Sequence, residues 1–148
     1  MGFLCNLSKS YAPLLGRILL AFIFLQSGFD KVLNYGKTIN LMAARGIPEP
    51  QILLPMAIAA LFIGGIMILV GWKARWGALA LILFMIPTTL YFHGYWTYPQ
   101  PLQLNQFHHF VKNLAIIGAL FMILGMGSGA LSVDGEERGR DAHGCGLG

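Results

Sequence analysis

Two rows of polar side chains stand where a long apolar run begins near the end of the sequence. At about 100° per residue, a helix over this segment would carry them on two adjacent stripes. The first stripe consists of Gln106, His109 and Asn113. The second stripe consists of Asn105, His108 and Lys112. We expect one stripe to face the interior of a helix bundle and the other to meet a neighbouring helix or the membrane surface.

Other polar side chains reach the same level if the preceding apolar runs are helices too. Lys31 ends the first run, and Tyr91 and His93 end the third. The pattern predicts a polar site with three catalytic residues, which are Lys31, His109 and Lys112. The predicted cofactor-binding residues are His93, Gln106, Asn113 and Tyr91. The alternative is that these residues only extend toward the membrane surface, as long polar side chains at helix ends do.

A quinone is the ligand that such a site would suit. Its carbonyl oxygens need one or two hydrogen-bond donors, an apolar wall and access from lipid. Haem is not expected, because His93 and His109 lie at the extreme ends of their spans. A dithiol mechanism is excluded, because Cys5 and Cys145 lie in opposite tails. No metal ion is expected either, since His143 and Cys145 would offer only two ligands from a glycine-rich tail.

The elements that would position these residues are membrane helices. The chain has 148 residues, of which 56% are hydrophobic and 11% charged, too few polar groups to cover a soluble domain. Four apolar stretches approach the ~20 residues that a span needs. They are residues 12–32, 52–71, 76–92 and 110–126. We expect an all-α membrane protein in a lipid bilayer, with a four-transmembrane-helix bundle over residues 1–134 and a mobile tail over residues 135–148.

The basic residues predict the orientation of the bundle. Four spans place both termini on the same side. That side carries Lys9, Arg17, Lys73, Arg75, Arg138 and Arg140. The other side carries Lys31, Lys37, Arg45 and Lys112. The bias predicts cytoplasmic termini and, in a bacterium, a place in the inner membrane. Because the basic residues are scattered over loops and form no patch, no nucleic-acid partner is expected.

The compositions of the first and third connections between the spans predict ordered structure. The first, residues 34–51, mixes apolar and polar side chains before Pro48 and Pro50, which predicts a short interfacial helix. The third, residues 93–106, is rich in aromatic side chains before Pro99 and Pro101. We expect it to form an ordered aromatic cap over one end of the bundle.

Several segments together resemble the DoxX family of small four-span membrane proteins. They are "LLGRILLAFIFLQSGFDKV", "ARGIP", "GGIMILVGWKARWGAL", the order from Gln106 through Lys112 to Gly118, and "GSGALSVDG". The resemblance implies a bundle related to the small subunit of a thiosulfate:quinone oxidoreductase. The positions that it carries over are Arg17, Gly28, Lys31, Gly65, His93, Gln106, Lys112, Asn113 and Asp134.

Two functions follow from these observations. The first is a quinone-linked redox or accessory subunit, in which Lys31 and Lys112 stabilise developing negative charge and His109 or His93 relays a proton. The chain has no redox cofactor motif, so a partner protein would supply the electrons. The second is a structural or assembly subunit of a larger membrane complex, with the polar cluster and the aromatic cap as its docking face.

Overall fold

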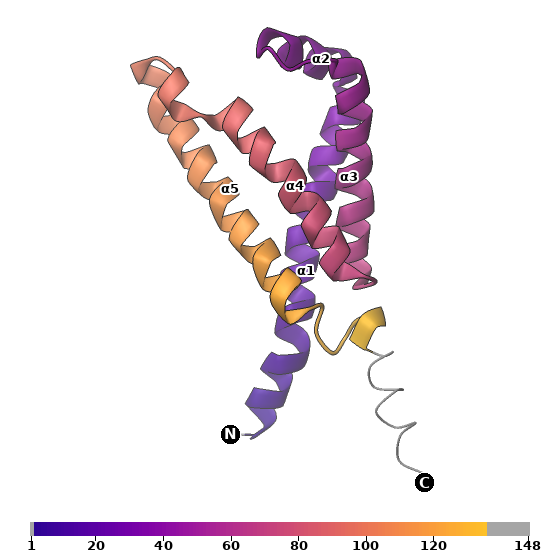
Figure 1. Ribbon diagram of the computed structural model, residues 1–148. Helices are drawn as coiled ribbons and strands as arrows, with labels where there is room; N and C mark the ends of the chain where they lie inside the picture. The colour runs from indigo at the N-terminus through magenta and orange to yellow at the C-terminus, as the bar shows by residue number, and fades with distance from the viewer. Residues whose placement is uncertain (1, 136–148) are drawn as a thin grey trace.

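All regular secondary structure in the described part of the chain is helical. The computed structural model describes residues 2–135, with side chains from Ser10 onward. The helices are α1 (Gly2–Leu33), α2 (Tyr35–Ala44), α3 (Pro50–Val70), α4 (Ala74–His93), the short 3-10 helix η1 (Tyr95–Thr97) and α5 (Gln100–Met126) (Figure 1). Four segments are long and apolar enough to cross a membrane, namely Ser10–Leu33, Pro50–Val70, Ala74–Thr97 and Gln100–Met126. The predicted all-α, four-transmembrane-helix fold is confirmed.

The long helices pack in chain order. α1 packs against α3, α3 against α4, and α4 against α5. Toward the end that carries α2 and η1, α4 and α5 diverge from α1 and α3 (Figure 1). The start of α1 and the end of the described chain lie together at the opposite end (Figure 1). Which of the two ends faces the cytoplasm stays a prediction.

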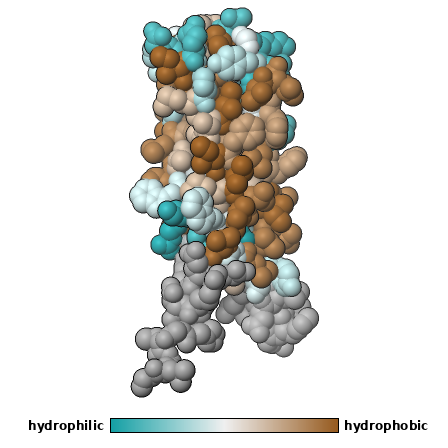
Figure 2. Space-filling view, turned by 90° about the vertical axis from the view of Figure 1, so that its right-hand side faces the viewer, coloured by the Kyte–Doolittle hydropathy of each residue, from teal (hydrophilic) through white to brown (hydrophobic). Residues whose placement is uncertain are grey.

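The buried core is narrow, and most of the helix surface is apolar. Its largest fully buried side chains include Phe24, Leu61, Leu81 and Leu120. Outside this core, large apolar side chains form a belt between more polar ends (Figure 2). In a bilayer the hydrocarbon solvates such a belt, so the helices are held together by close packing rather than by exclusion of water.

Two glycines allow the closest approach of α3 and α4. A Cβ added to Gly64 would lie 2.7 Å from Leu81 Cγ and 3.2 Å from the carbonyl oxygen of Gly77. A Cβ added to Gly77 would lie 3.1 Å from the carbonyl oxygen of Gly64. This crossing sets which face of α4 turns toward α3 and which turns toward α5.

The last helix begins earlier than the sequence suggests. α5 starts at Gln100, whereas we expected the span to start at Phe110. Pro99 precedes the helix in an extended conformation, with φ −65° and ψ 154°, and Pro101 lies in its first turn. Proline is well suited to the first turn of a helix, because its missing N–H would have no helical partner there. Here the two prolines begin a helix and do not prolong a loop.

The other connections place two further elements at the same end of the bundle. The expected interfacial helix is present as α2, in which Met42 is the buried residue. In the expected aromatic cap, the Tyr95 ring lies 5.2 Å from the Phe107 ring and 5.7 Å from the Phe110 ring, centroid to centroid. The predicted mobile tail, residues 135–148, lies outside the described residues except for Gly135.

Candidate functional site

The predicted site residues occupy two opposite faces of α4. Tyr91 points with Thr88 toward α1 and α3, because both side chains line a cavity there together with Lys31. His93 lies about 200° round the helix from Tyr91 and meets α5. Our expectation of one shared site is therefore corrected. The residues stand at a similar level of the bundle, but the α4 helix separates them into two groups.

The first group belongs to a cavity that we call the Lys31 chamber. Its volume is about 510 Å³. Residues from α1, α2, α3, α4 and the loop after α2 line it, including Lys31, Thr38, Met42, Ala57, Ala60, Phe84, Thr88 and Tyr91. The half-buried ammonium of Lys31 donates hydrogen bonds to Ser27 Oγ at 2.9 Å and to the Ser27 carbonyl oxygen at 3.5 Å. These contacts hold the Lys31 side chain along its own helix at the edge of the chamber.

The chamber is polar at one end and apolar along the rest of its length. The polar groups are the Lys31 ammonium and the hydroxyls of Thr38, Thr88 and Tyr91. Met56 and Leu83 belong to the lining as well and are each more than 60% exposed, so the chamber opens onto the lipid-facing surface between α3 and α4. A membrane-soluble molecule can therefore reach it from the side.

The second group forms a chain of polar contacts between α4 and α5, which we call the polar seam (His93, Gln106, His109 and Lys112). His93 Nδ1 lies 2.9 Å from Gln106 Oε1. The His93 and His109 rings stack at 5.1 Å between centroids and 22° between planes. Lys112 Nζ donates to His109 Nδ1 at 3.3 Å. Each residue of the seam thus makes a hydrogen bond with another seam residue, so the four side chains form one connected polar contact between α4 and α5.

Asn113 lies deeper along the same contact. Its side chain is buried, and Nδ2 donates a hydrogen bond to Thr89 Oγ1 at 3.1 Å. The two stripes of α5 divide as the helical spacing predicts. Gln106, His109 and Asn113 are half-buried or buried against α4, and Asn105, His108 and Lys112 are exposed. Asn113 therefore has a packing role between two helices and does not line the Lys31 chamber.

A buried arginine organises the opposite end of the bundle. Arg17 is 2% exposed, and its Nη2 donates a hydrogen bond to the carbonyl oxygen of Leu131. Among the described residues, its Nε and Nη1 have no hydrogen-bond partner. Asp134 comes shortly after Leu131 in the sequence. Its carboxylate accepts hydrogen bonds from the backbone N–H groups of Lys73 at 2.9 Å and Ala74 at 3.2 Å. The segment after α5 therefore caps the start of α4 and covers Arg17.

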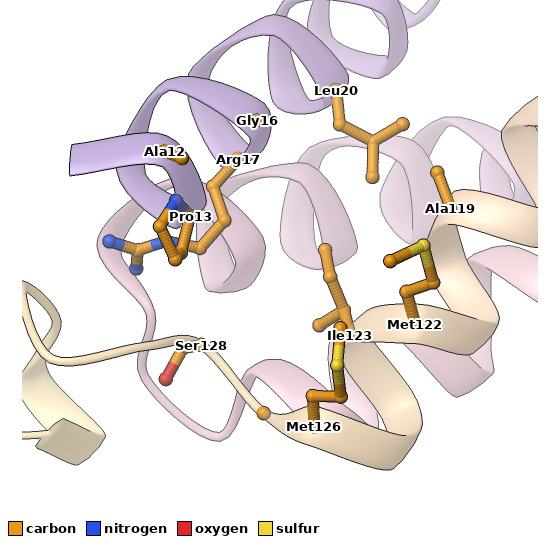
Figure 3. Close-up of a pocket in the computed structure, with 11 residues that line it drawn as sticks. Ala12, Pro13, Gly16, Arg17, Leu20, Ala119, Met122, Ile123, Met126 and Ser128 are labelled. Carbon is orange, nitrogen blue, oxygen red and sulfur yellow. The ribbon is translucent and has the colours of Figure 1, made fainter. Parts of the chain in front are cut away.

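A second cavity of about 360 Å³ lies beside this arginine (Figure 3). Its wall is formed mostly by apolar side chains of α1 and α5, including Leu20, Met122 and Ile123. The guanidinium of Arg17 turns away from Leu20 and Met122 (Figure 3). This cavity is thus an apolar crevice between two helices, in which Arg17 and Ser128 are the lining residues with polar side chains.

Some of these contacts involve residues to which the sequence pattern assigned no site role. Arg45 enters the topology prediction and the "ARGIP" segment of the resemblance, yet it bonds to Tyr91, which lines the Lys31 chamber, and to Tyr98. Asp134 was carried over by resemblance alone, and its capping role depends on a turn that brings residues 60 positions apart together. Neither contact leaves a signal in local periodicity. Within residues 10–135, no three His, Cys, Asp or Glu side chains gather in a way that could hold a metal ion.

Comparison with known proteins places the chain among bacterial membrane proteins. The family model described as DoxX matches residues 12–94. The inner membrane protein YphA of Escherichia coli K12 is 30% identical over 121 residues, which cover 82% of this chain and 86% of YphA. The inner membrane protein YqjF of the same strain is 34% identical over 121 residues, 82% of this chain and 88% of YqjF. A Surfeit locus protein 4 homolog of Drosophila melanogaster is 27% identical over 90% of this chain and 43% of its own length. No solved structure matches significantly.

Proposed function

The chain belongs to the DoxX family and is an integral inner-membrane protein, and from that premise we propose that it is a quinone-linked accessory subunit. The quinone head group would bind at the polar end of the Lys31 chamber. The observation that carries the proposal is this chamber itself, which combines a lipid-facing opening, apolar walls and a single ammonium group at one end.

The donors at the polar end suit a carbonyl ligand. An ammonium group has three protons. In Lys31, the contacts to Ser27 use no more than two of them, which leaves a donor for a ligand oxygen. The Tyr91 hydroxyl stands on the opposite wall, whereas the Thr88 hydroxyl already donates to the carbonyl oxygen of Phe84 at 2.8 Å. The Lys31 ammonium and the Tyr91 hydroxyl together match the few polar contacts that orient a small ligand in an otherwise apolar site.

The length of the chamber suits a ligand with an apolar tail. On α4 the lining extends from Tyr91 to Ala80, which corresponds to about 17 Å along the helix axis. At the apolar end, the small side chains of Ala57, Ala60 and Ala80 leave room beside Leu83. The head group of an isoprenoid quinone would lie at Lys31, and its tail would run along these alanines toward the middle of the membrane.

A bound quinone would supply the capacity to accept electrons. The chain itself would bind and orient the head group, and the Lys31 ammonium would stabilise negative charge that develops on the ligand oxygen. In this proposal Lys31 remains a catalytic residue and Tyr91 a ligand-binding residue. The α4 helix separates the chamber from the other residues that the sequence analysis assigned to the site, so they would not contact the quinone. These residues are His93, Gln106, His109, Lys112 and Asn113.

The proposal can be tested by direct binding. The protein is reconstituted in lipid nanodiscs and titrated with decylubiquinone, with quenching of tryptophan fluorescence as the signal. Lys31→Met should weaken binding by roughly tenfold or more, because a charged hydrogen bond to the ligand is lost. Lys37→Met removes a lysine that does not line the chamber and should leave the affinity unchanged. Equal affinity of the Lys31→Met variant and the wild-type chain would disprove the site.

The apolar end of the Lys31 chamber offers a second, independent readout. Ala60→Leu places a larger side chain at the apolar end, so it should weaken decylubiquinone more than a tailless benzoquinone with the same ring. An equal effect on the two ligands would mean that the tail does not lie along α3.

One observation favours the second candidate function, an assembly subunit. α5 packs on α4 and η1, and its polar residues Asn105, His108 and Lys112 are exposed on its outer side. A partner protein would cover polar groups that are costly against lipid. Mild solubilisation of native membranes and co-purification test this function. His108→Ala with Lys112→Ala should abolish a stoichiometric partner, and Lys31→Met should not.

A further inference from the structure

The Lys31 chamber is covered at its polar end by a short segment that we call the roof (residues 35–48). The roof consists of α2 and the loop that follows it. Thr38, Met42, Ile47 and Pro48 are its contribution to the chamber lining. Its main packing partners are α3 and α1. Contact with the α4 side of the chamber depends on the loop after α2.

A single arginine joins the roof to that far side. Arg45 Nη1 donates a hydrogen bond to the carbonyl oxygen of Tyr91 at 3.2 Å, and Nη2 donates to the Tyr98 hydroxyl. The guanidinium carbon also lies 4.7 Å from the centre of the Tyr98 ring, a cation–π contact. In residues 10–135, these are the hydrogen bonds that connect the roof with α4 and with Tyr98, the residue that follows η1.

The tyrosine in this contact is itself fixed to the chamber wall. The Tyr98 hydroxyl donates to the carbonyl oxygen of Phe92 at 2.8 Å. Phe92 and Tyr91 are the last lining residues of α4. Arg45 is therefore connected to two adjacent backbone carbonyl groups of α4, directly to that of Tyr91 and through the Tyr98 hydroxyl to that of Phe92. These contacts hold the roof against the α4 wall of the chamber.

We propose that Arg45 and Tyr98 form a latch that controls access from water to the polar end of the Lys31 chamber. The inference rests on the proposed function in that it regards the chamber as a ligand site. With the latch closed, Met42 and Thr38 cover the Lys31 end. With the latch open, water or a water-soluble reactant reaches the head group, and the lipid-facing opening between α3 and α4 is unaffected.

The roof has the properties of a segment that can move. α2 has 10 residues, fewer than an isolated helix needs to be stable, so its position depends on its contacts. On the far side of Arg45, Gly46 has φ +70° and no atom within 4 Å of an added Cβ, which leaves space for rotation. Arg45 therefore sits between a short amphipathic helix and an unobstructed glycine.

Thiol labelling tests the latch. In a chain with Cys5 and Cys145 replaced by serine, Met42→Cys places a thiol on the inner side of the roof, where Met42 is 7% exposed. A membrane-impermeant maleimide is added to the protein in nanodiscs. Labelling should be slow with the latch intact and at least about tenfold faster with Arg45→Met, because two hydrogen bonds and a cation–π contact are lost. Equal labelling rates would overturn the proposal.

Two controls separate the latch from general loosening of the fold. Tyr98→Phe keeps the ring and removes only the hydroxyl, so it should give an intermediate rate. Arg75→Met removes an arginine that bonds to the Gly125 carbonyl oxygen at the other end of the bundle, and it should leave the rate unchanged. Leu41→Cys, on the exposed side of α2, should label equally fast in all backgrounds.

The latch and the proposed ligand can fail separately. Decylubiquinone should slow the labelling of Met42→Cys if its head group lies beneath the roof. If it has no effect, but Arg45→Met still accelerates labelling, the latch stands and the quinone proposal fails. If decylubiquinone binds and Lys31→Met weakens it, but Arg45→Met leaves labelling unchanged, the quinone proposal stands and the latch fails.

Discussion

Gly71 is the position where a single methyl group should be most damaging to the end of the bundle that holds Arg17. Gly71 is the C-cap of α3 and has φ +73°, a left-handed conformation that destabilises the fold by about 1–2 kcal/mol for an L-residue. In Gly71→Ala, the new Cβ would also collide with Arg17 Nη1 and Ser132 Cβ. Forcing a methyl group into a packed site costs about 1–3 kcal/mol. The free energy of unfolding should therefore fall by about 2–5 kcal/mol.

Two other glycines separate the two causes. Gly46 has φ +70° and open space at the Cβ position. Gly46→Ala should therefore lower the free energy of unfolding only by the cost of the left-handed backbone, about 1–2 kcal/mol. Gly118 lies inside α5, without a positive φ and with open space at the Cβ position. Gly118→Ala should therefore leave the free energy of unfolding unchanged or raise it by up to about 1 kcal/mol. Unfolding in mixed micelles of dodecyl maltoside and SDS, followed by circular dichroism, measures all three. Equal losses for Gly71→Ala and Gly46→Ala would refute the close contact with Arg17.

Two further predictions concern polar contacts that join distant parts of the chain, and the same unfolding assay measures both. Asp134→Ala removes the acceptor for the N–H groups of Lys73 and Ala74, so it should cost about 1 kcal/mol, whereas Asp134→Asn should cost less because the amide oxygen still accepts. Identical losses for the two variants would contradict the capping role. Asn113→Leu leaves the buried Thr89 hydroxyl without its partner and should cost about 0.5–2 kcal/mol, but little more when Thr89→Val is added. Additive losses would show that the two side chains are not coupled.

Helical periodicity explains why part of the site could be predicted. The angle between successive residues is a property of the α-helix, so the buried stripe of Gln106, His109 and Asn113 follows from spacing alone. The spans follow from length and hydropathy for a similar reason. The start of α5 did not follow, because Pro99 and Pro101 are compatible with a loop or with the first turn of a helix.

The division of the site depends on packing that no single helix encodes. Spacing places Lys31, Tyr91 and His93 at one level of the membrane, but it does not say which face of α4 turns toward which neighbour. The Gly64 and Gly77 contact decides that orientation, since it puts α3 against one side of α4 and leaves the other for α5. The Arg45 latch has the same origin, because it joins residues 53 positions apart.

The Arg17 contact also constrains how the protein is made. Arg17 enters the membrane with the first span, and the carbonyl oxygen that accepts its hydrogen bond belongs to a residue 114 positions later. At about 5–20 residues per second, the ribosome adds that residue roughly 6–23 s afterwards. During this interval the arginine lacks its acceptor, and the insertion machinery or the headgroup region must solvate it. Completion of this end of the bundle is thus a late event in biogenesis, and a chain that stops before Leu131 would leave its first helix with an unpaired guanidinium.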